Sequence, residues 1–274
     1  LPSEPLLRAV VMCSTVEPWS TIAPMPTARS ALGVTGMDGI LYAIGGRDHN
    51  GYLSTAEAYN TTTGVWSTIA PMPTVSRSNL GVTGMDGILY AIGGADNTGY
   101  ANTADAYNTA TGVWSTIAPM PTARGYLGVT GMDGILYAIG GYDPSGYLST
   151  AEAYNTATGV WSTIAPMPTA RGYLGVTGMD GILYAIGGAD DNGGYLSTAE
   201  AYNTATGEWV TIAPMSTARG SLGATRMDGI LYAIGGLDRN GHHNGYLSTT
   251  EAYNTATREW STKAPMPIAR GSWE

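Results

Sequence analysis

The sequence predicts an all-β propeller built from four-stranded antiparallel blades, and three observations support this fold class. Gly-Gly pairs recur at 45–46, 93–94, 140–141, 187–188 and 235–236, with successive steps of 48, 47, 47 and 48 residues. Tryptophan keeps nearly the same spacing, at Trp19, Trp66, Trp114, Trp161, Trp209 and Trp260. Each interval holds four strand-like runs separated by turn signals. A repeat of this size is typical of one propeller blade.

The first two strands of each unit form a predicted hairpin. In the first unit, the run 32–37 reads as a strand, Asp38-Gly39 follows, and the run 40–44 reads as the second strand. Asp-Gly between two such runs is a strong signal for a type I′ turn, which needs positive φ at both positions. The second run, Ile-Leu-Tyr-Ala-Ile, does not alternate, which is typical of a strand buried on both faces.

The third and fourth strands follow a polar loop. The run 55–59 alternates small or apolar residues with polar ones, and a Thr/Gly-rich turn leads to the fourth strand at 65–69. The prolines of Ala70-Pro-Met-Pro73 then end the sheet, because proline cannot donate to a ladder. The repeated tryptophans and tyrosines are expected to pack between adjacent sheets.

One domain, 1–274, is predicted, with complete blades at about 29–76, 77–123, 124–170, 171–218 and 219–269. Residues 8–19 align without gaps on residues 55–66, so 7–25 read as a diverged third and fourth strand, and residues 270–274 begin a first strand. The partial blade would comprise 7–28 and 270–274. We therefore expect five complete blades plus an incomplete sixth shared between the two ends, with its edges as the weakest region. The alternative is a five-bladed ring with both tails accessory.

The repeated residues resemble the kelch motif. Arg29, Asp38-Gly39, Gly45-Gly46, Glu57-Ala-Tyr59 and Trp66 stand in kelch order, and the match recurs five times over about 29–269. The resemblance implies a kelch-type β-propeller of the adaptor kind and a structural role for the repeated arginine. One arginine and one carboxylate per blade at nearly constant offset also predict a repeated ion pair. The pairs would join Arg29, Arg77, Arg124, Arg171 and Arg219 to Glu57, Asp105, Glu152, Glu200 and Glu251.

Variation between the copies lies in two segments, namely the loop after Gly-Gly and the pair after the repeated arginine. Strand direction predicts that both lie on one face. In kelch domains similar to this one, these positions line the channel mouth and bind peptide segments of partner proteins. The rim would hold Arg47, Ala95, Tyr142, Ala189 and Leu237, surrounded by Ala31, Asn79, Tyr126, Tyr173 and Ser221. The predicted binding residues are Ala31, Arg47, Asp48, Asn79, Asp96, Tyr126, Tyr142, Asp143, Tyr173, Asp190, Asp191, Ser221, Asp238 and Arg239.

Charge favours a basic ligand on this face. The formal net charge is −9, and the variable loops carry six aspartates against Arg47 and Arg239. Tyrosine and aspartate together suit a peptide that carries Lys or Arg. The Asp-Asn-Gly loops are also good turn formers, so both readings stay open. No basic stripe or long apolar run is present, so neither nucleic acid nor membrane is an expected partner.

No convergent catalytic set is readable, so the expected function is non-catalytic binding without a metal or cofactor. His49 lies in the loop of one blade and the adjacent His242 and His243 in the loop of another, and Cys13 lies outside the complete blades. A kelch-like copper oxidase or a carbohydrate-active propeller is one alternative. A duplicated or designed propeller with no selected ligand is the other, because the blades are nearly identical. The compartment stays open, with the single cysteine and the kelch resemblance favouring the cytoplasm.

Overall fold

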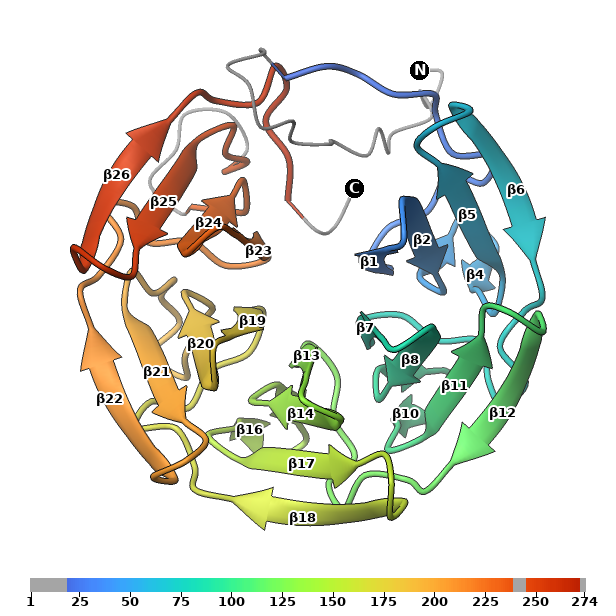
Figure 1. The fold of residues 1–274 in the computed structure, drawn as a ribbon, viewed down its shortest axis with the longest axis horizontal. Coiled ribbons are helices and arrows are strands. Elements are labelled where there is room, and N and C mark those ends of the chain that lie inside the picture. The colour runs from blue at the N-terminus through green and yellow to red at the C-terminus, as the bar shows by residue number, and fades with distance from the viewer. Residues whose placement is uncertain (1–18, 239–244, 272–274) are drawn as a thin grey trace.

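The computed structural model of the protein describes residues 19–238 and 245–271, which form a ring of five four-stranded blades (Figure 1). No helix occurs among the residues described, which confirms the predicted all-β class. The blades, numbered 1 to 5 in chain order, follow one another around a central axis, and in each the strand nearest the axis comes first.

The strands have the same lengths and places in every blade. The innermost strands are β1 (Gly33–Met37), β7 (Gly81–Met85), β13 (Gly128–Met132), β19 (Gly175–Met179) and β23 (Gly223–Met227). The second strands are β2 (Ile40–Ile44), β8 (Ile88–Ile92), β14 (Ile135–Ile139), β20 (Ile182–Ile186) and β24 (Ile230–Ile234). The third strands are β5 (Ala56–Asn60), β11 (Ala104–Asn108), β17 (Ala151–Asn155), β21 (Ala199–Asn203) and β25 (Thr250–Asn254). The outermost strands are β6 (Val65–Ile69), β12 (Val113–Ile117), β18 (Val160–Ile164), β22 (Glu208–Ile212) and β26 (Glu259–Lys263).

The Asp-Gly hairpin forms as the sequence predicts. Met37 pairs with Ile40 in the antiparallel register, which leaves Asp38 and Gly39 as a two-residue turn. Asp38 has φ 52° and Gly39 has φ 76°, the positive values that a type I′ turn requires. The other four blades repeat this pair of values closely.

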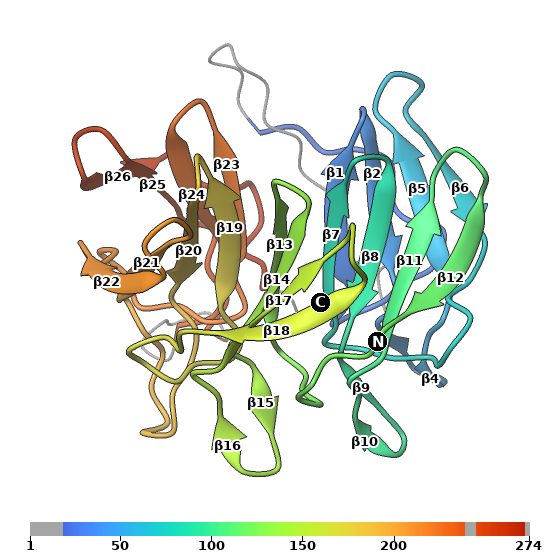
Figure 2. The same ribbon diagram turned by 60° about the horizontal axis from the view of Figure 1, so that its bottom comes forward.

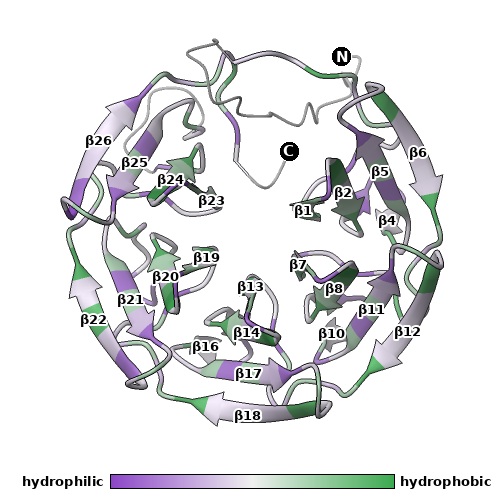
Figure 3. Cartoon of the chain, in the orientation of Figure 1, coloured by the Kyte–Doolittle hydropathy of each residue, from purple (hydrophilic) through white to green (hydrophobic). Residues whose placement is uncertain are grey.

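The third strand is buried on both faces, although its sequence alternates. In β5 the residues Ala56 to Tyr59 are all buried, including the carboxylate of Glu57. The second strands are also largely buried, and the hydropathy colouring places apolar residues along them (Figure 3). Blade-to-blade packing therefore covers both sides of the middle strands, and the core lies between adjacent sheets.

The repeated tryptophan fastens each blade to the one before it. Its indole N–H donates to an alanine carbonyl in the connection that leaves the preceding blade, for example from Trp114 to Ala70 at 2.7 Å and from Trp161 to Ala118 at 2.8 Å. The ring of Trp114 also packs against Tyr107, with 5.1 Å between centroids. The predicted packing role of both aromatic series is therefore confirmed.

The predicted ion pairs are present in all five blades. The shortest arginine–carboxylate distances lie between 2.6 and 3.2 Å, and both partners are buried. The guanidinium of Arg124 donates to Glu152 Oε2 at 2.6 Å and to the carbonyl oxygens of Thr150 and Gly140. Burial lowers the pKa of Arg124, and the charge of Glu152 opposes that effect. Each arginine thus joins the segment before the innermost strand to the second and third strands of its own blade.

Blades 1 and 5 are linked through the sector between them by a segment near each end of the described chain (Figure 1). Trp19 donates to the carbonyl of Ala264 at 2.8 Å, and Trp66 donates to the carbonyl of Ala23 at 2.9 Å. These bonds have the same form as those between consecutive blades. No strand occurs in 19–28 or 264–271. The rest of the predicted partial blade, 7–18 and 272–274, lies outside the described residues.

Candidate functional site

The two variable segments meet on one end of the ring, as strand direction predicts. After the repeated arginine, Ser30, Ser78, Gly125, Gly172 and Gly220 form backbone bridges to Arg47, Ala95, Tyr142, Ala189 and Leu237. In blades 1 to 3 the loop after Gly-Gly continues as a short ribbon, formed by β3 (Arg47–Asp48) with β4 (Gly51–Tyr52), β9 (Ala95–Asp96) with β10 (Gly99–Tyr100), and β15 (Tyr142–Asp143) with β16 (Gly146–Tyr147). Figure 2 shows these ribbons projecting from the same end of the molecule.

The channel mouth is built from residues in the left-handed conformation. The second residue after each repeated arginine has φ between 53° and 57°, although none is glycine: Ala31, Asn79, Tyr126, Tyr173 and Ser221. This conformation costs a non-glycine residue about 1–2 kcal/mol. Backbone hydrogen bonds from blade to blade hold it, with Tyr126 N donating to Asn79 O at 2.8 Å and Tyr173 N to Tyr126 O at 2.9 Å.

These five residues and the leucines that follow them line a cavity of about 130 Å³ at the mouth. Because their backbone is fixed by the blade-to-blade hydrogen bonds, their side chains vary without changing the scaffold. Different side chains can therefore be presented at the channel mouth on the same backbone.

A tyrosine cluster extends over blades 2 to 4 on this end. Tyr126 and Tyr173 pack closely, with 4.2 Å between ring centroids. Tyr100 lies 6.4 Å from Tyr126 and 5.8 Å from Tyr142, and Tyr147 lies 5.1 Å from Tyr142 and 6.2 Å from Tyr173. Most of these pairs have the edge-to-face geometry that aromatic rings favour.

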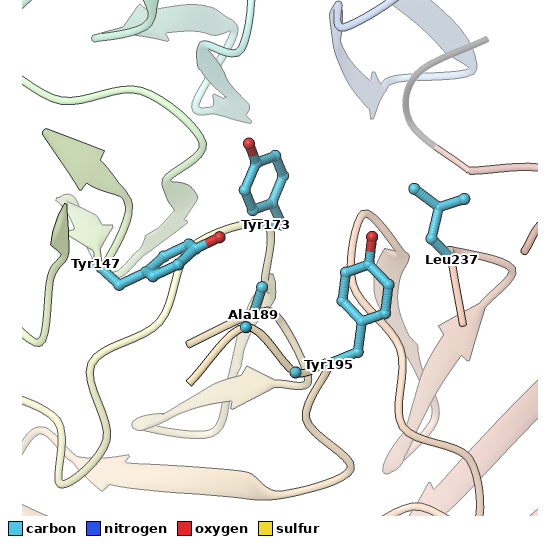
Figure 4. A pocket seen from close by; sticks show the side chains of 7 residues that line it. Tyr147, Tyr173, Ala189, Tyr195 and Leu237 are labelled. Carbon is cyan, nitrogen blue, oxygen red and sulfur yellow. The ribbon is translucent and has the colours of Figure 1, made fainter. Parts of the chain in front are cut away.

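A larger pocket of about 410 Å³ opens at the edge of the cluster (Figure 4). Its walls combine three aromatic rings with small and aliphatic residues, namely Tyr147, Tyr173, Ala189, Gly193, Gly194, Tyr195 and Leu237. Figure 4 shows Tyr147, Tyr173 and Tyr195 standing around the opening, with Leu237 across from them. The pocket has the apolar lining with a few hydroxyls that is typical of sites for small or extended ligands.

Burial raises the pKa of Tyr173, and the neighbouring Tyr126 adds to the increase. Burial also raises the pKa of Tyr100. These rings are therefore neutral phenols at physiological pH, with the negative ring faces that attract cations.

The loop aspartates shape the ribbon tips. Asp48 Oδ1 accepts hydrogen bonds from Asn50 N at 2.7 Å and Gly51 N at 3.1 Å, and Asp143 Oδ1 accepts one from Ser145 N at 2.7 Å. Asp96 and Asp190 accept equivalent bonds from the residues two positions ahead. These donors lower the pKa of Asp48, and the bonds from Thr98 lower that of Asp96. The turn-forming interpretation is thus confirmed, and the lowered pKa values of Asp48 and Asp96 favour their charged forms on this end.

Asp191 differs from the other loop acids because it contacts a neighbouring blade. Its Oδ1 accepts a hydrogen bond from Tyr147 N at 3.2 Å, so the loop of blade 4 lies against the ribbon of blade 3. In blade 5, Asp238 N donates to Gly245 O at 2.7 Å. Arg239, His242 and His243 lie outside the described residues, and Arg47 is an exposed residue of β3 in the ribbon of blade 1.

Three tyrosines of the cluster and the pocket are absent from the predicted binding set: Tyr100, Tyr147 and Tyr195. A signal for them exists, because every variable loop ends in tyrosine. Their constancy suggests scaffold, yet each ring packs on the glycine after the arginine of the next blade, as Tyr147 does on Gly172. The tyrosine that ends every loop therefore lies beside the pair after the repeated arginine, which varies from blade to blade.

Among residues 19–238 and 245–271, no group of three or more His, Cys, Asp or Glu side chains is placed to hold a metal ion. Within the same residues, no helix is long and apolar enough to cross a membrane.

Comparison with known families gives one match that covers most of the chain. The Kelch motif matches five times, at residues 28–73, 76–121, 123–168, 170–216 and 218–267, and these limits follow the five blades closely. No curated protein matches the chain. The five motif matches, the buried arginine–carboxylate pairs and the four-stranded blades together show that this chain belongs to the kelch-repeat β-propeller family.

Proposed function

We propose that this propeller is a non-catalytic scaffold that binds a peptide segment of a partner protein on the end formed by the ribbons and the channel mouth. Kelch propellers commonly serve as protein-interaction scaffolds. The observation that carries the proposal for this chain is the tyrosine cluster of blades 2 to 4 with the pocket beside it. Tyrosine is enriched in protein interfaces because it offers large contact area at low entropic cost.

The binding surface is one-sided. Blades 1 and 2 place Ala31, Asn79 and Ala95 at positions where blade 3 has Tyr126 and Tyr142. The pocket of Tyr147, Tyr173 and Tyr195 is likewise off the axis. We therefore place the ligand over blades 3 to 5, with a side chain entering the pocket between blades 4 and 5.

A basic side chain fits this pocket best. Neutral phenol rings attract a Lys or Arg cation by about 0.5–2 kcal/mol, depending on how far the pair is desolvated. Asp191 and the turn aspartates add negative charge around the opening. Long-range attraction of this kind also speeds association and weakens as salt is added.

The test compares binding of pooled basic and acidic peptides to the whole chain and to two tyrosine variants. Tyr195→Ala removes one wall of the pocket. Tyr52→Ala removes the corresponding ring of blade 1, and the next blade, blade 2, has Asn79 and Ala95 in place of tyrosines. Basic peptides are expected to bind, to lose about tenfold or more in affinity with Tyr195→Ala, and to be little affected by Tyr52→Ala.

Preference for the acidic pool would overturn the basic ligand, and equal losses for both variants would overturn the pocket. Binding of neither pool would instead favour a duplicated propeller with no selected ligand. Circular dichroism and thermal unfolding of each variant separate lost binding from lost folding.

A further inference from the structure

The innermost strands of consecutive blades interlock through a repeated glycine fit. A Cβ added to Gly33 of β1 would collide with the side chain of Val82 of β7, and the same holds for Gly81 with Val129 and Gly128 with Val176. In the reverse direction, Met37 of β1 lies over Gly84 of β7, where an added Cβ would be 3.2 Å from the methionine sulfur. The interfaces between blades 1 and 2, 2 and 3, and 3 and 4 thus place Val on Gly and Gly under Met. Between blades 4 and 5, an added Cβ on Gly175 would meet Ala224 instead of a valine, and Arg226 takes the place of the second glycine.

The sector between blade 5 and blade 1 presents both halves of this interface unoccupied by any described residue. An added Cβ on Gly223 of β23 would meet only Ile234 of its own blade within 4 Å, and one on Gly36 of β1 would meet only Ile40 and Leu41. Val34, the counterpart of Val82, is 48% exposed. Among the described residues, Gly223 of blade 5 therefore has no valine over it and Met227 no glycine beneath it. In blade 1, Val34 has no glycine opposite it and Gly36 no methionine over it.

The outer side of this sector has the same tryptophan hydrogen bonds as a complete blade. Trp19 and Trp66 make the hydrogen bonds of consecutive blades, through Ala264 and Ala23. Arg270 takes the place of the repeated arginine, because Gly236 N donates to its carbonyl at 2.7 Å, as Gly188 N does to Arg219 at 2.9 Å. The sector thus has the spacing of a blade, and among residues 19–238 and 245–271 none takes the place of an inner hairpin.

We infer that this sector binds a β-hairpin that carries the repeat's own pattern Gly-Val-Thr-Gly-Met followed by Asp-Gly and Ile-Leu-Tyr-Ala-Ile. One such hairpin satisfies both open faces. Its valine would sit on Gly223 and its second glycine under Met227, while its first glycine would face Val34 and its methionine would cover Gly36. Within the printed sequence, this pattern and its variant Gly-Ala-Thr-Arg-Met occur only in the five blades.

The probe is a labelled synthetic peptide with the sequence of residues 124–141, offered to the whole chain at low concentration and followed by fluorescence anisotropy. Saturable binding is expected, together with slower hydrogen exchange in β1 and β23. A peptide of the same composition in scrambled order is the control for adhesion to apolar surface.

A matched pair of substitutions tests the glycine fit itself. Gly223→Val should weaken binding by roughly tenfold or more, because the valines of the two partners would then overlap. The chain variant should still fold, because an added Cβ at Gly223 meets no other blade and its φ is not left-handed. A peptide in which Val129→Gly removes the opposing side chain should restore binding to the Gly223→Val chain.

Recovery in this swapped combination is the decisive result, since general loss of fold cannot produce it. The inference is wrong if the scrambled peptide binds equally well, if no peptide binds, or if all four chain and peptide combinations have the same affinity. Binding of basic peptides over blades 3 to 5 is a separate measurement at other residues, so failure of this inference leaves the proposed function standing.

Discussion

Each buried arginine depends on a set of acceptors that only a guanidinium can reach at once. Arg124 extends one nitrogen to the carbonyl oxygens of Thr150 and Gly140 and the other to Glu152 and to the carbonyl of Ala138. The planar, forked group supplies these donors in fixed directions, whereas the ammonium of lysine is a single point charge. The charged guanidinium of Arg124 can be buried because the second strand, the third strand and the segments beside them all supply hydrogen-bond acceptors to it.

Breaking the pair in blade 3 should therefore be costly. Glu152→Gln leaves the guanidinium of Arg124 buried without a countercharge, and we expect a loss of about 3–5 kcal/mol in the free energy of unfolding. Urea unfolding followed by tryptophan fluorescence measures it. Arg47→Lys, a change at an exposed arginine, serves as the control and should shift the free energy by less than about 0.5 kcal/mol. A loss for Glu152→Gln no larger than that of the control would contradict the structural role of the pair.

Ser216 gives the carboxylate of blade 5 a special environment. It stands where the other connections have proline, as at Pro73 and Pro121, and its N–H and hydroxyl donate to Glu251 Oε2 at 2.7 and 2.8 Å. Burial of Glu251 raises its pKa, but the hydrogen bonds from Ser216 and the charge of Arg219 outweigh this effect, so the pKa is lowered overall.

A lowered pKa makes the contribution of Glu251 pH-dependent. The stabilisation is complete above the unfolded-state pKa of about 4.5 and is lost as the pH falls through the lower folded-state value. Ser216→Pro, which restores the repeat residue, removes both hydrogen bonds. We expect its deficit in the free energy of unfolding, relative to the unmodified chain, to shrink as the pH falls from 7 to 3. A deficit that stays constant over this range, in urea titrations at each pH, would contradict the assignment.

At the scale of the element, the hairpins and the Gly-Gly segments use glycine for different reasons. Gly134 ends the Asp-Gly turn of blade 3 with φ 75°, and an added Cβ there would find only Thr156 Oγ1, at 3.8 Å. Gly141 has φ 106°, and its added Cβ would lie 2.7 Å from the carbonyl oxygen of Gly125. Gly134 is required only for its positive φ. Gly141 is required both for its positive φ and because the backbone of Gly125 lies too close for a side chain.

The two substitutions should separate these effects. Gly134→Ala is expected to cost about 1–2 kcal/mol, the strain of a left-handed alanine. Gly141→Ala should cost more than about 3 kcal/mol, because overpacking against backbone adds to that strain. Thermal and urea unfolding of the two variants, measured side by side, give both values. Equal losses in the free energy of unfolding for the two variants would mean that the backbone at Gly125 moves away from Gly141 without cost.

The elements that repeat were predictable, because each signal occurs five times. The Asp-Gly turns, the middle strands and the arginine–carboxylate pairs follow from residue types at constant spacing. Tyr126, Tyr142 and Tyr173 are among the binding residues that the sequence predicts, but their ring contacts with Tyr100 and Tyr147 could not be predicted. These contacts depend on which tyrosine of one blade faces which residue of the next. The left-handed backbone of Tyr126 and Tyr173 also escapes prediction, since a bulky residue rarely adopts positive φ.

At the scale of the whole molecule, the five blades do not have equal support. Blades 2 to 4 are packed on both faces by neighbours, whereas β1 and β23 each have one face without a described neighbour. The segments 19–28 and 264–271 tie the sector through Trp19 and Trp66 at its outer side. Apolar burial between sheets supplies most of the stability of such a ring, so its resistance to local opening should fall toward the sector.

Hydrogen exchange under native conditions tests this gradient. Amides of β1 and β2 in blade 1 and of β23 and β24 in blade 5 should exchange faster than those of β13 and β14, which lie in the same places of blade 3. Trp19→Phe, which removes the hydrogen bond to Ala264, should speed exchange in blades 1 and 5 and leave blade 3 unchanged. If exchange instead slowed or quickened uniformly in all five blades, the ring would open as one cooperative unit, and its stability would not depend on the sector between the first and last blades.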